Sequence, residues 1–253
     1  MPRVIISGCN GRMGQVMTRM LEERKIEVVA GFDRQTDKLS TYPVYADPME
    51  YGGDADVIVD FSVPDATDEL LKYALQRRLP VVICTTGHSD EQLRNIEEAS
   101  HTIPVFKSGN MSVGIILMAN LMKKVAAVLG GNFDVEIIER HHRMKLDAPS
   151  GTAIMLADAV REGLDYEPEY IFERQSVRRQ RGEHEIGISS LRGGTIVGEH
   201  SVVFAGTDEV LEFRHSAQSR EVFANGAVTA ALYISEITAP GIYDMNDALS
   251  SLL

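Results

Sequence analysis

The stretch RVIISGCNGRMGQVMTRMLEERK, from Arg3 to Lys25, decides the fold of the first half of the chain. Its apolar start predicts a buried strand, and apolar residues then recur on one face of a predicted helix, at Met13, Val16, Met17, Met20 and Leu21. Gly8, Gly11 and Gly14 lie between the two. A dinucleotide pyrophosphate needs such close approach to the backbone, together with the amides of a helix N-terminus. The G-x-x-G-x-x-G spacing differs from the usual G-x-G-x-x-G, so an ordinary strand-to-helix turn is the alternative interpretation.

Apolar strands and amphipathic helices alternate from this stretch to about residue 110. Further strands are predicted at IEVVAGFD, ADVIVDFS, LPVVICTTG and IPVFKSGN, with helices at PDATDELLKYALQRR and SDEQLRNIEEAS. This alternation indicates a parallel sheet covered on both faces. It predicts an α/β fold with a Rossmann-type dinucleotide-binding domain.

The pattern changes after Asn110, where a long apolar helix precedes a strand at NFDVEIIERHH and a helix at SGTAIMLADAVREGL. The runs HEIGISSLRGG, TIVGEHSVVFAG and DEVLEFRHSA predict consecutive strands of an antiparallel sheet, joined by glycine turns. We therefore expect an α+β domain with a mixed or antiparallel sheet at residues 112–219. Residues 163–184 are polar and charge-mixed, which predicts an exposed loop or lid. A final helix could return to the first domain, giving it residues 1–111 and 220–253.

Composition limits the classes of partner. The 253 residues carry a net charge of −12, which argues against nucleic acid as the main partner. We see no run of about 18 apolar residues, so no membrane span is expected, and the N-terminus lacks the apolar core of a signal peptide. Cys9 and Cys84 fit neither a disulfide framework nor a zinc spacing, so a reducing cytoplasm is the expected location.

The end of the second predicted strand suits an adenosine ribose. Asp33 lies 19 residues beyond Gly14, where an acid meets the ribose hydroxyls in dinucleotide sites. A guanidinium at Arg34 could hold a 2′-phosphate and stack on adenine. Asp33 favours NADH and Arg34 permits NADPH, so both cofactors remain open, and an ordinary exposed turn is the alternative.

Small or polar residues also stand at the ends of three other strands, in DFS at 60–62, CTTG at 84–87 and KSGNM at 107–111. Ligands of a doubly wound sheet bind at this edge. Backbone groups at Thr85, Thr86, Ser108, Gly109, Asn110 and Met111 could therefore line the nicotinamide and its ribose. A helix cap or turn is the alternative at each position, and Cys9 and Cys84 are expected to be reduced thiols without a catalytic role.

The stretch ERHHRMKLDAPSGTA, from Glu139 to Ala153, concentrates cations, a proton carrier and a helix start. Adjacent residues of a strand point to opposite faces, so the strand must end near His141 and His142 if both are to serve one ligand. Lys145 adds a positive charge, a histidine supplies a proton near neutral pH, and Ser150 can cap a helix whose first amides belong to Gly151 and Thr152. The cluster therefore suits an anionic substrate that is both held and protonated. A structural histidine pair beside a common helix cap is the alternative, and a metal site is not expected because no third ligand has motif spacing.

These blocks together resemble the 4-hydroxy-tetrahydrodipicolinate reductase family (older name dihydrodipicolinate reductase) of lysine and diaminopimelate biosynthesis. ERHHRMKLDAPSGTA is the most specific of them, and GCNGRMG, VDFS, TTG, SGNMSVG, GEHSVVFAG and SREVFANGA follow in the family's order. The resemblance implies reduction of a cyclic imine bearing two carboxylates, with hydride from NADH or NADPH. It also implies that His141 is the proton donor and acceptor, that Lys145 binds a carboxylate or donates a proton, and that His142, Gly151 and Thr152 contact the substrate.

The resemblance further implies cofactor contacts and an assembly. The matching cofactor stretches contain Gly8, Cys9, Asn10, Gly11, Arg12, Met13, Asp33, Arg34, Cys84, Thr85, Thr86, Ser108, Gly109, Asn110 and Met111. Members are homotetramers joined through the sheets of the second domain, and the two domains are expected to close on the ligands.

Three positions depart from the family pattern. Cys84 stands where Gly is frequent, Met111 where Phe is common, and Val63 where some members carry Arg near the adenosine phosphate. The last difference, with Asp33, tilts the expectation towards NADH or dual use. Rival interpretations are a Rossmann reductase acting on another cyclic or linear imino acid, a nicotinamide-sensing regulator without catalysis, and a scaffold protein.

Overall fold

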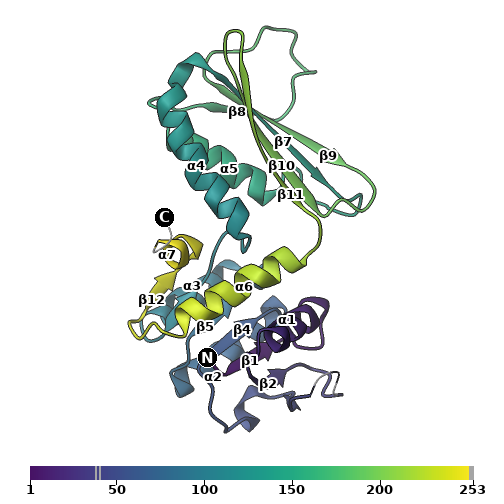
Figure 1. The fold of residues 1–253 in the computed structure, drawn as a ribbon, viewed down its shortest axis with the longest axis vertical. Helices are drawn as coiled ribbons and strands as arrows, with labels where there is room; N and C mark the ends of the chain where they lie inside the picture. Colours follow the sequence, from purple (N-terminus) through teal and green to yellow (C-terminus); the bar gives the residue numbers. More distant parts are fainter. Residues whose placement is uncertain (38, 40, 251–253) are drawn as a thin grey trace. The chain divides into compact units, whose positions relative to one another are not determined.

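The computed structural model describes residues 1–250 apart from residues 38 and 40. The chain divides into two compact units, drawn in Figure 1. Unit 1 comprises Met1–Met111 and Glu221–Leu253, and unit 2 comprises Ser112–Arg220. Unit 2 is thus inserted into the sequence of unit 1.

The described part of unit 1 contains a seven-stranded sheet in the order β12-β6-β5-β4-β1-β2-β3, and every neighbouring pair is parallel. The strands are β1 (Val4–Ser7), β2 (Val28–Phe32), β3 (Val44–Tyr45), β4 (Val57–Asp60), β5 (Val81–Ile83), β6 (Pro104–Phe106) and β12 (Gly241–Tyr243). Ser7 is in register with Phe32 of β2 and Asp60 of β4, and Asp60 with Ile83 of β5. The residues that follow these strands therefore meet at one edge of the sheet.

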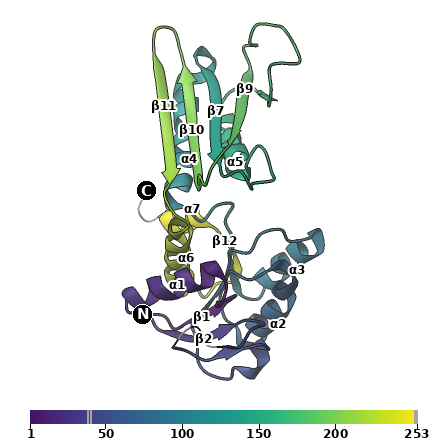
Figure 2. The same ribbon diagram turned by 90° about the vertical axis from the view of Figure 1, so that its right-hand side faces the viewer.

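Helices cover both faces of this sheet, as Figure 2 shows. They are α1 (Arg12–Glu23), α2 (Thr67–Arg77), α3 (Asp90–Ser100), α6 (Glu221–Ile234) and α7 (Met245–Leu249). Helices α2 and α3 pack together through a core that includes Leu70, Leu71 and Ile96, while α1 packs on α6, which lies over β4, β5 and β6. Short 3-10 helices occur at η1 (Pro48–Glu50), η2 (Pro64–Ala66) and, in unit 2, η3 (Gly130–Asn132). The arrangement of strands and helices in unit 1 confirms the predicted Rossmann-type domain.

Unit 2 has a mixed sheet, which among its described residues has the order β11-β10-β7-β9-β8. The strands are β7 (Asp134–His141), β8 (Glu169–Ile171), β9 (Glu185–Arg192), β10 (Gly198–Ala205) and β11 (Val210–Ala217). The expected mixed or antiparallel sheet is confirmed, but β9 and β10 are not neighbours, so the prediction of consecutive antiparallel strands is wrong there. β7 lies between them, parallel to β9 and antiparallel to β10. The link at residues 193–197 can pass the end of β7, because two strand spacings are only about 10 Å.

Helices α4 (Val113–Leu129) and α5 (Gly151–Arg161) cover one face of the unit 2 sheet (Figures 1 and 2). Their core includes Met118, Met122 and Leu156, packed on apolar residues of β7, β9 and β10. The segment predicted as a loop contains β8, and its arginines fold back on the sheet: Arg174 and Arg181 pair with Glu136, and Arg174 and Arg179 pair with Glu185. It is therefore anchored by ion pairs.

One helical stretch among the described residues, Val113–Asn132, is long and apolar enough to cross a membrane by length and composition, with a mean hydropathy of 1.7. Asn120, Lys123 and Lys124 interrupt its apolar residues, so the stretch is not an uninterrupted run of about 18 apolar residues. The stretch contains α4, whose Met118, Met122 and Ala126 belong to the core of unit 2. Packing on α5 and the sheet accounts for the apolar character of these positions.

Candidate active site

Unit 1 carries a pocket of about 520 Å³ at the carboxyl edge of its sheet. Its lining includes Gly8, Gly11, Asp33, Arg34, Ser62 and Val63. The structure thus brings together the glycine loop, Asp33 and Arg34 after β2, and the turn after β4, as a dinucleotide site requires.

The glycine loop is shaped by close backbone contacts. Gly8 has φ +72°, and a Cβ there would lie 2.6 Å from the carbonyl oxygen of Phe61. A Cβ at Gly14 would lie 2.2 Å from the carbonyl oxygen of Gly8, so α1 and the loop touch backbone to backbone. Gly11 is the N-cap of α1, and no side chain among the described residues caps this helix. The amides at the start of α1 therefore suit a pyrophosphate, and the residues present fit a dinucleotide.

Asp33 is already engaged with the loop. Its Oδ2 accepts a hydrogen bond from the backbone N–H of Asn10 at 3.0 Å, and its Oδ1 accepts from that of Gln35 at 3.1 Å. The Asn10 side chain donates to the carbonyl of Gln35 at 2.5 Å. These contacts fix the Asp33 carboxylate in the pocket wall, beside the exposed Arg34.

The other predicted cofactor residues follow β5 and β6. Thr85 Oγ1 and, at the end of β4, Asp60 Oδ2 are buried atoms without a hydrogen-bond partner among the described residues. Buried polar atoms are normally paired, so both are candidates to face a bound group. Met111 is buried under α6, where a Cβ at Gly226 would lie 1.6 Å from the Met111 carbonyl oxygen. Thr86, Ser108, Gly109 and Asn110 lie in the connections after β5 and β6 and are not fully buried.

Both cysteines are free thiols. Cys9 is fully buried, and a Cβ at Gly31 would lie 2.5 Å from its Sγ, so the side chain points into the sheet and leaves the backbone for a ligand. Burial raises the pKa of Cys9 to about 11 and also raises that of Cys84. Both thiols therefore stay protonated at neutral pH.

In unit 2, β7 ends at His141, between the two histidines, as the sequence argument required. The side chains of Val135, Ile137, Glu139 and His141 alternate onto the buried face of the strand. His142 lies in the turn after the strand, where its carbonyl accepts from the N–H of Lys145. The apolar core face of β7 thus turns polar over its last residues.

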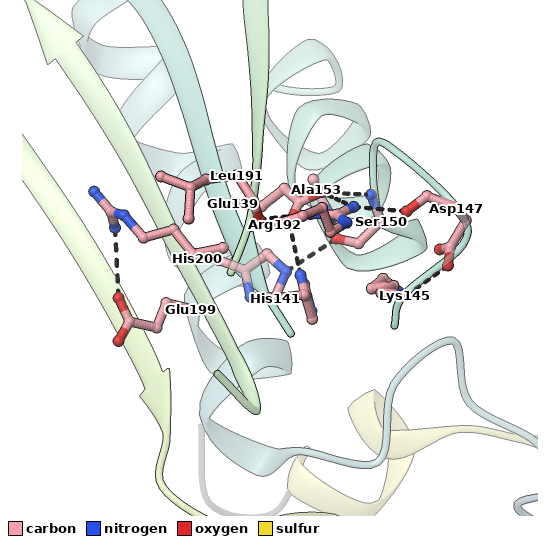
Figure 3. Close-up of polar contacts among 11 residues, drawn as sticks. Glu139, His141, Lys145, Asp147, Ser150, Ala153, Leu191, Arg192, Glu199 and His200 are labelled. Atoms are coloured by element: carbon pink, nitrogen blue, oxygen red, sulfur yellow. Dashed lines mark hydrogen bonds and ion pairs between the residues drawn. The ribbon is translucent and has the colours of Figure 1, made fainter. Parts of the chain in front are cut away.

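Glu139 is the centre of this polar end (Figure 3). Its Oε2 accepts from His141 Nδ1 at 2.6 Å, and both of its oxygens pair with the Arg192 guanidinium at 2.7 Å. Burial would raise the pKa of this carboxyl, but the hydrogen bonds from Arg192 and His141 lower it to about 2. Burial lowers the pKa of His141, and Glu139 opposes that effect. Glu139 is thus a buried, ionised and fully paired carboxylate.

Ser150 caps α5, as predicted. Its Oγ accepts from the N–H of Ala153 at 3.2 Å and lies 3.1 Å from His200 Nε2, and its own N–H donates to Glu139 at 3.1 Å. Ser150 is buried and held within the protein, whereas Gly151 is exposed at the first position of the helix. Gly151 and Thr152 form a first turn in which the described side chains include no acid, which suits a carboxylate ligand.

Lys145 lies in the connection between β7 and α5. Its Nζ pairs with Asp147 Oδ1 at 2.9 Å, and the Lys145 side chain is 22% exposed while that of Asp147 is 58% exposed. An ion pair open to solvent on one side is weak, so an anionic ligand can replace Asp147 as the partner.

Glu139, Arg192 and His200 were missed as site residues by the sequence argument. Arg192 is in register with His141 across β7 and β9, and His200 with Glu139 across β7 and β10. One signal was available: Glu139 falls on the same alternating face as Val135 and Ile137, and a carboxylate on a buried face requires a cation. The sequence cannot say which arginine supplies it, since Arg192 is 53 residues away.

Comparison with known proteins agrees with this geometry. The family described as dihydrodipicolinate reductase, N-terminus, matches residues 2–111, and its C-terminus counterpart matches residues 114–249. A 4-hydroxy-tetrahydrodipicolinate reductase from Caldanaerobacter subterraneus is 52% identical over 248 residues, and one from Clostridium perfringens is 44% identical over 251 residues, with 98% of each chain covered in both cases. The solved structure of a dipicolinate-bound dihydrodipicolinate reductase from Paenisporosarcina sp. TG-14 has a TM-score of 0.74 and 29% identity, with 100% of both chains covered.

A Rossmann-type unit with this pocket, together with a unit that carries a buried carboxylate–histidine cluster, defines a nicotinamide-nucleotide-dependent oxidoreductase. The expected enzyme class and the expected cofactor, NADH or NADPH, are thereby confirmed. The chain belongs to the dihydrodipicolinate reductase family, which confirms the resemblance carried by its motifs.

Proposed function

We propose that the chain reduces 4-hydroxy-tetrahydrodipicolinate, through dihydrodipicolinate, to tetrahydrodipicolinate, in lysine and diaminopimelate biosynthesis. The observation that carries this proposal is family membership along the whole chain combined with the cluster of Glu139, His141 and Ser150 at the start of α5. A relative of known structure binds dipicolinate, a planar dicarboxylate of the same class as the substrate.

Unit 1 is proposed to hold the cofactor, which supplies the hydride when it is bound. The loop from Gly8 to Met13 would place its amides against the pyrophosphate, and Asp33 would accept the ribose hydroxyls. Arg34 lines the same pocket and would neutralise a 2′-phosphate. Residues 84–86 and 108–111 would contact the nicotinamide and its ribose.

Unit 2 is proposed to bind the substrate dianion. Lys145 and the amides of Gly151 and Thr152 supply positive potential for the carboxylates, and His142 is a further contact. We assign Ser150 a supporting role, because its hydroxyl and its N–H are taken up by α5, His200 and Glu139.

His141 is proposed as the proton donor. Hydride addition at C4 of the conjugated imine sends an electron pair to the neighbouring carbon, which takes a proton to complete the reduction. Nδ1 of His141 is bound to Glu139, so Nε2 is the atom that transfers this proton, and solvent returns it afterwards. A positioned general acid typically contributes about 10²–10⁴-fold in rate.

Because the chain belongs to this family, we also propose that it forms a homotetramer in the cytoplasm. The helices of unit 2 pack on one face of its sheet, and the opposite face presents Leu191 and Val210, which are 47% and 65% exposed. Exposed apolar side chains on a sheet face are suited to pairing with other copies of the chain. Light scattering of the purified protein measures the assembly, and a monomeric mass at micromolar concentration would refute it.

The function is tested by following absorbance at the nicotinamide band. Substrate is generated enzymatically from pyruvate and aspartate semialdehyde, and NADH and NADPH are supplied in turn. We expect oxidation of the cofactor that depends on the substrate. Equal rates with an unrelated imino acid would favour the rival reductase assignment, and a lack of oxidation with either cofactor would refute the proposal.

A further inference from the structure

The buried ion pair of Glu139 and Arg192 dictates the protonation geometry of His141. Glu139 is 0% exposed and ionised, so its oxygens can only accept hydrogen bonds. Nδ1 of His141 lies 2.6 Å from Oε2, and it must therefore be the nitrogen that carries the proton in the neutral ring. Nε2 is left as the nitrogen that exchanges a proton.

The Glu139–Arg192 pair also affects the charge beside the His141 ring. A lone buried carboxylate beside an imidazole stabilises the imidazolium and weakens it as an acid. Here the Arg192 guanidinium pairs with both oxygens of Glu139 at 2.7 Å, and it also donates to the carbonyl of Asp147 at 2.6 Å. The carboxylate thus keeps its orienting hydrogen bond to His141 while its charge is offset.

We propose that Glu139 and Arg192 act together as positioning residues, which hold His141 with its proton on Nδ1 and cancel the carboxylate charge beside the ring. This inference rests on the proposed function, in which His141 transfers the proton. It assigns to the pair neither contact with the substrate nor a proton transfer of its own.

The other groups around His141 fit this assignment. From the connection after β7, Lys145 opposes the imidazolium, and from β10 His200 lies edge-on to the ring at a centroid distance of 5.2 Å. His215 of β11 faces His200 from the next strand. Burial, Lys145 and Arg192 thus oppose protonation of His141, whereas the hydrogen bond and charge of Glu139 favour it.

Gly198 keeps the working nitrogen accessible. A Cβ at this first residue of β10 would lie 3.1 Å from His141 Nε2. Because contacts of that length are tighter than normal packing, a side chain there would press on the atom that exchanges the proton. Arg192 thus acts on the Nδ1 side of the His141 ring through Glu139, and Gly198 acts on the Nε2 side.

The test uses Glu139→Gln, Arg192→Lys, Arg192→Met and the double variant Glu139→Gln/Arg192→Met in the full-length chain. Arg161→Met is the matched control, because Arg161 pairs with Asp158 and Glu167 at the end of α5. One readout is ¹⁵N NMR of the His141 imidazole in the free protein, which reports tautomer and titration without any turnover. The other is the pH profile of kcat/KM.

We expect the neutral wild-type ring to carry its proton on Nδ1. Glu139→Gln should move the proton to Nε2 and lower kcat at least 10-fold with an unchanged KM for NADH, since loss of an orienting carboxylate can cost up to about 10⁴-fold. Arg192→Met should shift the alkaline limb of the profile to higher pH, while Arg192→Lys and the Arg161 control should keep it in place. A wild-type ring protonated on Nε2, or an unmoved limb in Arg192→Met, would overturn the proposal.

Arg192→Met leaves a buried carboxylate without its cation and can fail to fold. In that case the double variant decides, because it removes both charges. It should fold and turn over as slowly as Glu139→Gln, and wild-type turnover in it would overturn the proposal. If the wild-type protein shows the expected tautomer but reduces no imine, the proposed function fails while the pairing stands.

Discussion

The Ser150 hydroxyl and the His200 imidazole lie 3.1 Å apart, so the N-cap of α5 is tied to the neighbouring strand β10. Ser150 Oγ also accepts from Ala153 N–H, and which of Ser150 and His200 donates to the other depends on the His200 tautomer. This contact fixes the end of α5 that carries Gly151 and Thr152, and burial lowers the pKa of His200 to about 4, so the ring is neutral near pH 7.

Ser150→Ala should therefore cost more than loss of an ordinary cap. The cap contributes about 1 kcal/mol, and a buried His200 left without its hydrogen-bond partner costs about 1–3 kcal/mol more. Ser89→Ala is the matched control, because Ser89 caps α3 at an exposed position. Urea unfolding should show a loss of about 2–4 kcal/mol for Ser150→Ala and about 1 kcal/mol for Ser89→Ala. Equal losses would contradict the role of His200.

Acid should destabilise the protein through His200. Burial, with a smaller contribution from His141, lowers its pKa from 6.5 to about 4. Between these two values the unfolded chain binds a proton that the native protein does not, so stability falls as pH falls from 6.5 to 4, by up to about 3 kcal/mol. Loss of the stabilisation from ionised Glu139 starts only below its ordinary pKa of 4.5 and ends near 2.

His200→Gln should flatten this dependence, since Gln does not titrate. Urea midpoints measured between pH 7 and pH 5 should decline less for His200→Gln than for the wild-type protein. A residual slope is expected because burial also lowers the pKa values of His141 and His215. Parallel slopes for the two proteins would place the acid sensitivity elsewhere.

His141→Gln should reduce kcat by about 10²–10⁴-fold, because it removes the proposed general acid. NADH binding, followed by fluorescence titration, should be unchanged, since the pocket of unit 1 contains no part of His141 among its lining residues. A variant with wild-type kcat would exclude His141 as the acid.

Lys145→Ala should raise the KM for the substrate by about 10- to 100-fold, because the loss of a hydrogen bond to a charged group weakens binding by about that factor. Asp147→Asn should leave this KM unchanged or lower it, because Asp147 competes for the same ammonium group. The control is Lys123→Ala, which removes an equivalent pair with Glu162 at 2.9 Å. Steady-state kinetics decide, and equal effects of Lys145→Ala and Lys123→Ala would remove the substrate role.

Arg34→Ala should weaken NADPH much more than NADH. Asp65 and Glu69 line the same pocket as Asp33, so a 2′-phosphate meets three carboxylates and depends on Arg34 for compensation. We expect the KM for NADPH to rise by about 10-fold or more, with a change of less than about 3-fold for NADH. Identical changes for both cofactors would show that Arg34 contacts their common part.

Prediction from sequence succeeded where structure is encoded locally. Strands β1, β2, β4, β5 and β6 of the unit 1 sheet are predicted apolar runs, whereas the two-residue strand β3 was not predicted. Parallel order then places Gly8, Asp33 and Ser62 at one edge without further information. The end of β7 at His141 agrees with the expectation from side-chain alternation, combined with the condition that His141 and His142 serve one ligand.

The partners of Glu139 depended on pairings that local patterns do not encode. A hairpin-like succession of strands predicts that β9 and β10 are neighbours, yet β7 separates them. That insertion is what places Arg192 on one side of Glu139 and His200 on the other. The missed half of the site and the wrong strand order therefore have one cause.

The division of unit 1 into two sequence pieces also affects its biosynthesis. Strands β1 to β6 leave the ribosome before Ser112–Arg220, whereas α6, whose Ala224, Ala227 and Val228 are fully buried, follows afterwards. At about 5–20 residues per second the nascent sheet waits roughly 5–20 s with the β4–β6 part of one apolar face uncovered. Nascent chains of this enzyme should therefore engage holding chaperones during that interval, and polypeptides terminated at Arg220 should be insoluble.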